Sequence, residues 1–480
     1  MPTVEIDESA AGRYHRLTGY VRDRHWLRPA DDPRIRGDFV PMPADRRPAE
    51  WKTYPAGLRR VALPRRLSPV TDRGGQPFDV AELAGLLHHT AGIVRWRPGR
   101  NGPPVLLRAA ASAGNLHPIE TYLHTAGVDR LDDGVWHYDA RRHQLVHIGP
   151  ACGSGVALVL SAVPWRSEWK YAERGYRHVL WDAGTVTANA TLLAAGAGRS
   201  PLVRIGFGDA DVAAAIGADG VREVPLALID LAGGPVELRP DSPAAAGELG
   251  APGPEFPLVD AAHAAGNRTT WPAVGSGARP QSAEPGDPSA MASDERVRRR
   301  SATRRFVPEA VIPAVAVREV LTRAIEPVSW DAGPDPLRYR LVVHHVEGWP
   351  PGVYRWTPDG ESLLREGDLR AEAVAACTGQ AAAGACACLL LCSADLGGVL
   401  GAGGDRAYRA LQLRAGLVAG RLQLMTVAEG LGSSPLTLHD ENASSLVGAG
   451  EAGLLAVAVG RPAVLARPGG PPTRPTRLMR

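Results

Sequence analysis

The sequence predicts an α+β fold that is built twice within one chain, and three pairs of matching segments lead to this prediction. The segments follow one another in the same order in both copies, and a glycine fifteen residues after each Gly-Val-aromatic segment is repeated as well. A period of about 230 residues indicates a duplicated domain rather than a solenoid. The pairs are Gly134-Val-Trp-His-Tyr with Gly352-Val-Tyr-Arg-Trp, Tyr176-Arg177 with Tyr408-Arg409, and Ser200-Pro201-Leu202 with Ser434-Pro435-Leu436.

Each half is expected to contain the same elements in the same order. An amphipathic helix opens each half, over residues 80–92 and 314–325, and an extended strand and a hairpin follow it. A buried strand, a long helix and a final apolar strand complete each half, over 155–163, 182–198 and 224–233 in the first and over 385–394, 414–430 and 453–462 in the second. This mixture indicates an α+β domain. The long helices are rich in Ala, Gly and Thr, which suits a buried central helix or a dimer seam.

The domain boundaries follow from a change of composition in the middle of the chain. Residues 236–292 are dominated by Pro, Gly, Ala and Ser without apolar periodicity, which predicts a linker. The sequence therefore predicts an N-terminal extension over 1–60, a first domain over 61–235, the linker over 236–292 and a second domain over 293–480.

Composition and charge exclude several function classes. Among 480 residues the hydrophobic fraction is 44% and the charged fraction 22%, which excludes a disordered chain. The net charge of +3 and the lack of a basic patch interleaved with aromatics argue against nucleic-acid binding. No run of eighteen apolar residues and no apolar signal core occur, which argues against a membrane and predicts a cytoplasmic location. Only two of the 54 basic residues are lysines, Lys52 and Lys170.

Two further patterns are interpreted as structural. Cys386, Cys388 and Cys392 alternate in an apolar run and are expected to be small core residues on one strand face, with no metal bound. Gly401-Ala-Gly403-Gly404 lacks the spacing and the acidic residue of a dinucleotide-binding fingerprint.

Three segments are candidates for chemistry. In Ser112-Ala113-Gly114-Asn115-Leu-His117-Pro118, small residues precede a proline and predict a tight loop whose backbone can approach a flat ligand; an ordinary surface turn is the alternative. Lys170-Tyr171 offers two groups with tunable pKa values, against the alternative of a solvated helix start. Arg300, Ser301 and Arg304 could clamp a phosphate, although an arginine run can also be a solvated face or a processing site.

Taken together, these segments resemble the flavin-dependent nitroreductase superfamily. Within it, the Ser112–Glu120 loop, the Gly134 hairpin and Lys170-Tyr171 with Asp182-Ala-Gly look like the azoline dehydrogenases of thiazole/oxazole-modified peptide biosynthesis, the streptolysin S-type oxidases. Tandem forms of this family occur in thiopeptide pathways. The segments Tyr14-His-Arg-Leu-Thr18 and Lys52-Thr-Tyr-Pro55 are also similar to the leading segment of that family.

The resemblance implies oxidation of a peptide thiazoline or oxazoline to thiazole or oxazole, with FMN as hydride acceptor and molecular oxygen as the final acceptor. It implies Lys170 and Tyr171 as the catalytic pair, a modified precursor peptide as substrate and a cyclodehydratase complex as a partner. Two alternatives stay open: an NAD(P)H-dependent nitro or quinone reductase on the same fold, and a non-catalytic flavin-binding module.

Each half lacks what the other half has. The position of Ser112 is occupied by Trp330 in the second half, and the positions of Lys170 and Tyr171 by Ala402 and Gly403. The first half offers only Arg65-Arg66 for a phosphate. The resemblance therefore predicts an intramolecular pseudo-dimer with one composite site. Its cofactor-binding residues would be Arg300, Ser301 and Arg304, the loop residues Ser112, Ala113, Gly114, Asn115 and His117, and the flavin-edge residues Ser434, Pro435 and Leu436.

Overall fold

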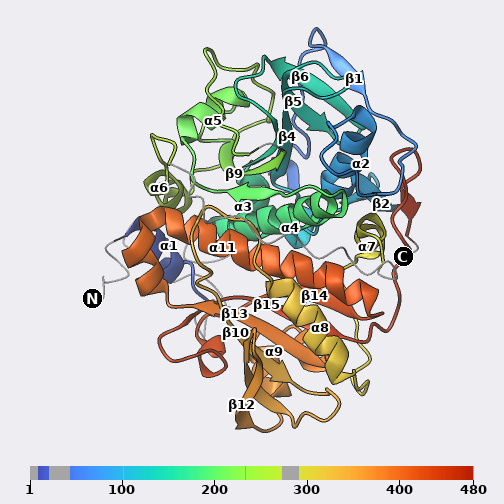
Figure 1. Ribbon diagram of the computed structural model, residues 1–480. Helices are drawn as coiled ribbons and strands as arrows, with labels where there is room; N and C mark the ends of the chain where they lie inside the picture. Colours follow the sequence, from blue (N-terminus) through green and yellow to red (C-terminus); the bar gives the residue numbers. More distant parts are fainter. Residues whose placement is uncertain (1–8, 21–43, 101, 233, 273–290, 479–480) are drawn as a thin grey trace.

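A computed structural model of the protein describes residues 9–20, 44–100, 102–232, 234–272 and 291–478. Each half of the chain contains one antiparallel sheet, and the two sheets lie on either side of two long helices that cross the middle of the molecule, α4 (Gly175–Gly196) and α11 (Leu396–Ala428) (Figure 1). The small residues of both helices allow this close approach, as the sequence predicts.

The two sheets have the same strand order. The first is β1-β6-β5-β4-β7-β9-β8 and the second is β12-β11-β10-β13-β15-β14, so that each strand of the second sheet has a counterpart and only β1 is additional. The predicted duplication of an α+β unit is therefore confirmed by the topology. The helices and strands of the first half are α1 (Ala10–Leu17), η2 (Ala44–Arg46), β1 (Arg60–Ala62), α2 (Val80–Ala91), β2 (Ile93–Arg97), β3 (Val105–Arg108), η3 (Ala113–Asn115), β4 (Ile119–Thr125), β5 (Gly134–Asp139), β6 (Gln144–Gly149), β7 (Val156–Ala162), α3 (Trp165–Tyr171), η4 (Ala172–Arg174), α4, β8 (Leu202–Arg204), α5 (Asp209–Ala215) and β9 (Val224–Ala232).

The second half repeats the order of the sheet strands, with helices α9 and α10 inserted between β12 and β13. Its elements are α6 (Pro257–Ala265), α7 (Ser293–Arg299), α8 (Ala314–Ile325), β10 (Arg338–Val343), β11 (Gly352–Thr357), β12 (Gly360–Glu366), α9 (Arg370–Ala376), α10 (Ala382–Ala385), β13 (Cys388–Ala394), α11, β14 (Gly432–Thr437), η5 (Asn442–Ser445), β15 (Ala452–Gly460) and β16 (Thr476–Arg477). Cys388 and Cys392 are buried in β13 and pack in one cluster, as predicted. Cys386 is also buried but lies two residues before the strand and packs in a different cluster, so the prediction of one strand face is wrong for this residue. Gly401–Gly404 lies in the α11 helix.

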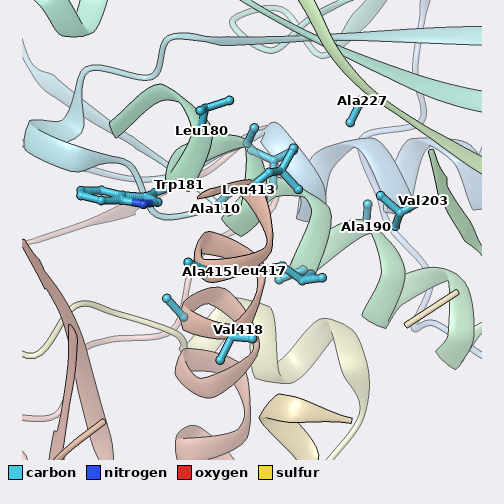
Figure 2. Packing of buried hydrophobic residues seen from close by; sticks show 14 of the residues in the cluster. Ala110, Leu180, Trp181, Ala190, Val203, Ala227, Leu413, Ala415, Leu417 and Val418 are labelled. Carbon is cyan, nitrogen blue, oxygen red and sulfur yellow. The ribbon is translucent and has the colours of Figure 1, made fainter. Parts of the chain in front are cut away.

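Helices α4 and α11 touch through two glycines. A side chain at Gly184 would collide with the α11 backbone at Leu413 and Leu417, and one at Gly416 would collide with the backbone of Trp181. One hydrophobic cluster contains buried residues of both halves, including residues of α4 and α11 (Figure 2). The two halves thus share one hydrophobic core rather than each forming a separate globular domain.

Two helices lie inside the segments that the sequence predicts as an extension and a linker. Helix α1 lies within residues 1–60 and helix α6 within residues 236–292, and each contacts a tyrosine of the opposite half through a histidine. The His15 ring nitrogen Nδ1 lies 3.2 Å from the Tyr408 hydroxyl, and His263 Nδ1 lies 3.0 Å from the Tyr176 hydroxyl. Composition concealed α6 because alanine-rich sequence is compatible with both a helix and a linker.

Residues 236–256 are not a free linker either. Val236, Leu238 and Phe256 are buried, and Ala245 donates a backbone hydrogen bond to Ile148 of β6 at 2.8 Å. This segment lies along the first sheet, and residues 273–290 of the predicted linker are outside the described part of the chain.

The C-terminal end of the second domain returns to the first half. Strand β16 pairs in parallel with β2, Gly470 donates to the carbonyl of Val94 at 2.8 Å, and α7 packs against α4 and α11. The domains are therefore interlaced at this end. Among the described residues, no helix has the length and apolarity needed to cross a bilayer.

Candidate active site

The Ser112–His117 loop contains several residues with positive φ angles, and the carboxylate of Asp182 accepts two hydrogen bonds from its start. Gly114, Asn115 and His117 have φ angles of 63°, 59° and 47°, and two of these three residues carry a side chain. The Ser112 hydroxyl donates to Asp182 Oδ2 at 2.6 Å, and the Ala113 N–H donates to Asp182 Oδ1 at 2.9 Å. Strained residues of this kind persist only where the surrounding structure enforces them.

The polar side chains of the loop already have hydrogen-bond partners within the protein. The His117 N–H donates to Ser112 Oγ at 2.8 Å, the Asn115 amide donates to the carbonyl of Leu106 at 2.8 Å, and His117 Nε2 lies 3.0 Å from Asn115 Oδ1. Burial and the neighbouring arginines lower the pKa of His117 well below its usual value, so the ring is neutral. The loop therefore presents backbone, rather than these side chains, to a ligand.

Lys170 and Tyr171 lie against the same loop. They occupy the last turn of α3, and a methyl group placed on Gly114 would be 2.9 Å from the Tyr171 hydroxyl and 3.0 Å from Lys170 Nζ. Only glycine leaves room for the pair at this position. The Tyr171 ring is stacked on His178 with centroids 4.0 Å apart.

The two members of the pair have opposite pKa shifts. Partial burial and the nearby Arg304 lower the pKa of Lys170, whereas burial, Asp182 and Tyr20 raise the pKa of Tyr171. A neutral lysine is therefore easier to form here than in water, and the tyrosine keeps its proton at neutral pH. Lys170 is partly exposed, whereas Lys52 is buried in an ion pair with Glu223 at 2.5 Å.

A strained residue follows the pair directly. Ala172 has φ 46° and ψ −140°, and Gly404 occupies the corresponding kink in α11 with φ 63° and ψ −163°. The second copy therefore keeps the kink with a glycine but has Ala402 and Gly403 in place of the lysine and the tyrosine.

The arginine cluster of the second half reaches this first-half loop. Arg300 is buried, and its Nε donates to the carbonyl of Ala109, three residues before Ser112, at 3.0 Å. Burial and Arg95 lower the pKa of Arg300 to about 9, which leaves it a cation at neutral pH. Within the described part of the chain no carboxylate pairs with Arg300 or Arg304, and the Ser301 hydroxyl has only a long contact of 3.5 Å to Ala302.

The flavin-edge segment lies on β14 next to this cluster. Ala302 forms a parallel bridge with Ser433, so the arginine segment runs beside β14, in which Ser434 lies opposite Ala458 and Leu436 opposite Ala456. The structure thus brings the predicted residues of the two halves to one place.

The opposite, symmetry-related position is filled by the chain itself. Trp330 forms a parallel bridge with Val203 of β8, where the Val203 N–H donates to Ser329 at 2.9 Å and the Asp331 N–H donates back to Val203 at 3.2 Å. Arg65 and Arg66 are exposed. The buried Trp330 thus lies beside β8, at the position that corresponds to Ser112.

Sequence reasoning missed the residues that connect the halves. Asp440 accepts from Arg174 and Arg177, and the signal was present, because Arg174-Gly-Tyr-Arg177 is repeated as Arg406-Ala-Tyr-Arg409. Asp182 belongs to the Asp-Ala-Gly motif, but residue spacing does not indicate its contacts with Ser112 and Ala113, which lie 70 and 69 positions away.

A cavity of about 300 Å³ lies away from this loop, between α2, the end of α4 and the segment 68–73, and none of the predicted site residues lines it. Its charged groups are already paired, as in Arg73–Asp79 at 2.5 Å and Arg199–Glu82 at 2.9 Å. It therefore offers no unpaired group for a phosphate.

Comparison with known proteins gives one curated relative and several solved structures. No model of a known protein family matches the chain. A protein named as a nitroreductase from Methanocaldococcus jannaschii is 26% identical over 188 residues, which cover 36% of this chain and 88% of that protein. The microcin synthetase McbBCD of E. coli, solved with a truncated pro-MccB17 bound, has 22% identity and a TM-score of 0.28 over 37% of this chain and 71% of that chain.

A match over nearly the full length comes from a crystal structure. A protein named as a nitroreductase from Anabaena variabilis superposes with a TM-score of 0.74 at 24% identity, covering 95% of this chain and 99% of that chain. With 95% of the chain covered, the match extends over both halves of the duplicated unit. The chain therefore has a duplicated nitroreductase-like fold.

Proposed function

We propose that this chain is an FMN-dependent oxidoreductase that converts thiazoline or oxazoline rings of a modified precursor peptide to thiazole or oxazole. The observation that carries the proposal is the meeting of two sets of groups: Lys170 and Tyr171 lie against the Gly114 loop, and Arg300, which has no carboxylate partner in the described chain, reaches the base of the same loop from the other half. The ring chemistry is taken from the motifs that resemble azoline dehydrogenases.

The residues at this position fit FMN. Arg300 and Arg304 have no carboxylate partner among the described residues, and a phosphate would supply the missing anion, with Ser301 as a further donor. The backbone of the Ser112–His117 loop and the Ser434–Leu436 edge would lie along the flat ring. When bound, FMN supplies a hydride acceptor.

The side chains then have distinct tasks in the oxidation. Aromatising an azoline ring removes one carbon-bound proton and one hydride. Lys170 in its neutral form takes the proton at Nζ, which its lowered pKa favours, and Tyr171 keeps its proton and can orient the ring by donating a hydrogen bond. Molecular oxygen is proposed as the final electron acceptor, and a cyclodehydratase that forms the azoline as the partner.

The test begins with the cofactor. The purified chain should be yellow and release FMN on denaturation. Lys170→Ala and Tyr171→Phe should keep the flavin and lose azoline oxidation by about 10²–10⁴-fold, since this is the usual effect of removing a positioned acid or base. A colourless chain that takes up no added FMN, or parent-like turnover by both variants, would contradict the proposal.

A second candidate is reduction of a nitro or quinone compound with NAD(P)H, which the similarity to the M. jannaschii protein favours. The two functions use the same site with opposite electron flow. Rapid bleaching of the bound flavin by NAD(P)H would support the reductase, whereas bleaching by an azoline peptide would support the dehydrogenase.

A further inference from the structure

The two halves are connected by two arginine–aspartate clusters that correspond to each other under the internal duplication. In the first cluster, Arg174 and Arg177 of the first half donate to Asp440 of the second, at 2.8 and 2.7 Å. In the second cluster, Arg406 and Arg409 of the second half donate to Asp209 of the first, at 2.8 and 2.9 Å. We call them the Asp440 cluster and the Asp209 cluster.

The correspondence extends to the backbone around each aspartate. Asp440 accepts from the Tyr20 N–H at 2.9 Å, and Asp209 accepts from the Arg268 N–H at 2.8 Å. Arg174 also donates to the carbonyl of Thr18, as Arg406 does to the carbonyl of Gly266 at 3.1 Å. Both aspartates therefore accept from two arginines of the other half and from one backbone N–H group.

The Asp440 cluster lies at the candidate active site. Arg174 follows Tyr171 by three residues, and its other nitrogen donates to the carbonyl of Leu438 at 2.8 Å. Leu438 is the first residue after β14, which contains Ser434–Leu436. One side chain thus joins the end of the helix that carries Lys170 and Tyr171 to the end of the strand that would line the flavin.

The Asp209 cluster lies at the filled position. Arg406 contacts the carbonyl of Ile205, directly after β8, and β8 is covered by Trp330. In the described residues, the corresponding position before Arg406 carries Ala402 and Gly403. The Asp209 cluster therefore has the same two arginines and one aspartate, but no lysine or tyrosine at the positions that correspond to Lys170 and Tyr171.

From this asymmetry we infer that Asp440 is a positioning residue of the composite site: through Arg174 and Arg177 it sets the distance between the Lys170–Tyr171 pair and the flavin-edge strand, while Asp209 only stabilises the fold. The inference rests on the proposed function. It adds that the second half contributes to catalysis not only phosphate-binding arginines but also the placement of the first-half base.

The experiment compares Asp440→Asn with Asp209→Asn in the full chain. Each change leaves two buried guanidinium groups without their carboxylate, so both variants should lose several degrees of thermal midpoint to a similar extent. Only Asp440→Asn should weaken FMN binding, alter the visible absorption and circular dichroism of the bound flavin, and lower kcat by about 10²-fold, because misplacement by about 1 Å has effects of this size. Asp440→Glu should restore part of kcat.

A milder pair guards against a variant that fails to fold. Arg174→Lys and Arg406→Lys keep the positive charge but lose the hydrogen bonds to Leu438 and Ile205, respectively, that the additional guanidinium nitrogens donate. Only Arg174→Lys is expected to change the flavin spectrum and lower kcat. Equal effects of both clusters on the flavin spectrum and on kcat would overturn the inference. If the parent chain binds no FMN at all, the proposed function itself is contradicted. If the parent binds FMN but the Asp440 and Asp209 variants behave alike, only the inference about Asp440 is contradicted.

Discussion

A methyl group added at Gly114 is expected to reduce turnover far more than it reduces stability. Its φ of 63° favours glycine, and a β-carbon there would meet the Tyr171 hydroxyl and Lys170 Nζ. Gly114→Ala should therefore displace the pair and reduce azoline oxidation by about 10²-fold, with a loss of about 1–2 kcal/mol in the free energy of unfolding from the left-handed conformation.

Gly74→Ala is the matched control for this prediction. Gly74 has φ 55°, and a β-carbon there would meet nothing within 4 Å. The two variants should lose similar stability in urea titrations, and only Gly114→Ala should lose turnover. Similar turnover in both variants would show that the contact with the pair has no functional consequence.

Asp182 should make the stability of the loop depend on pH. Burial raises the pKa of Asp182 to about 7, despite the two donors from Ser112 and Ala113. The pKa of Asp182 in the folded state lies above the unfolded value of about 4. The contribution of Asp182 to the free energy of unfolding is therefore fully present below pH 4 and is lost as the pH rises to 7. Over this range the free energy of unfolding falls by at most about 1.4 kcal/mol per pH unit.

Asp182→Asn removes this titration while keeping an acceptor for the Ala113 N–H. Between pH 4 and 7 the free energy of unfolding of the parent should therefore fall more steeply than that of the variant, as measured by urea titration at several pH values. Other titrating groups cancel in the difference between the two proteins. Parallel curves would mean that Asp182 is ionised throughout this range.

At the scale of elements, the contact between α4 and α11 depends on Gly184 and Gly416. Because a β-carbon at Gly184 would collide with backbone rather than with a flexible side chain, Gly184→Ala should cost about 3 kcal/mol of unfolding free energy. Gly85→Ala in α2 is the control, since a β-carbon at Gly85 would meet nothing within 4 Å and helix propensity favours alanine by up to about 1 kcal/mol. Thermal unfolding should show a lowered midpoint for Gly184→Ala and an unchanged or raised midpoint for Gly85→Ala. Equal midpoints would show that the contact between the helices at Gly184 has no effect on stability.

The sequence located most elements because their signals are local. Helices α2 and α8 lie within the predicted residues, since apolar side chains recur at helical spacing there. Helices α1 and α6 could not be paired from the sequence, because their common feature is a histidine that contacts a tyrosine of the opposite copy. Such a contact leaves no periodic pattern.

At the scale of the whole molecule, the structure leads us to expect one FMN per chain. The candidate site combines the Gly114 loop with Arg300, whereas the related position is closed by the pairing of Trp330 with Val203. Acid release of the flavin, compared with the protein concentration, should give a ratio close to one. Two tightly bound FMN per chain would refute the single composite site.

The double variant Arg300→Ala/Arg304→Ala tests which half holds the phosphate. It should lose most of its FMN affinity, while Arg65→Ala/Arg66→Ala, the corresponding change in the first half, should keep it. Fluorescence titration of the apoprotein measures both. Equal retention by the two double variants would show that the phosphate is bound elsewhere.

The sequence by itself determined the duplication, the order of the elements and the three segments that could carry chemistry, because each of these depends on residue types at short spacing. Only the tertiary structure decided which segments meet. Arg177 and Asp440 are 263 positions apart, and Arg300 is 191 positions from Ala109. Their pairing depends on how two copies with a shared core are turned toward each other, and that geometry follows from the close approach of α4 and α11.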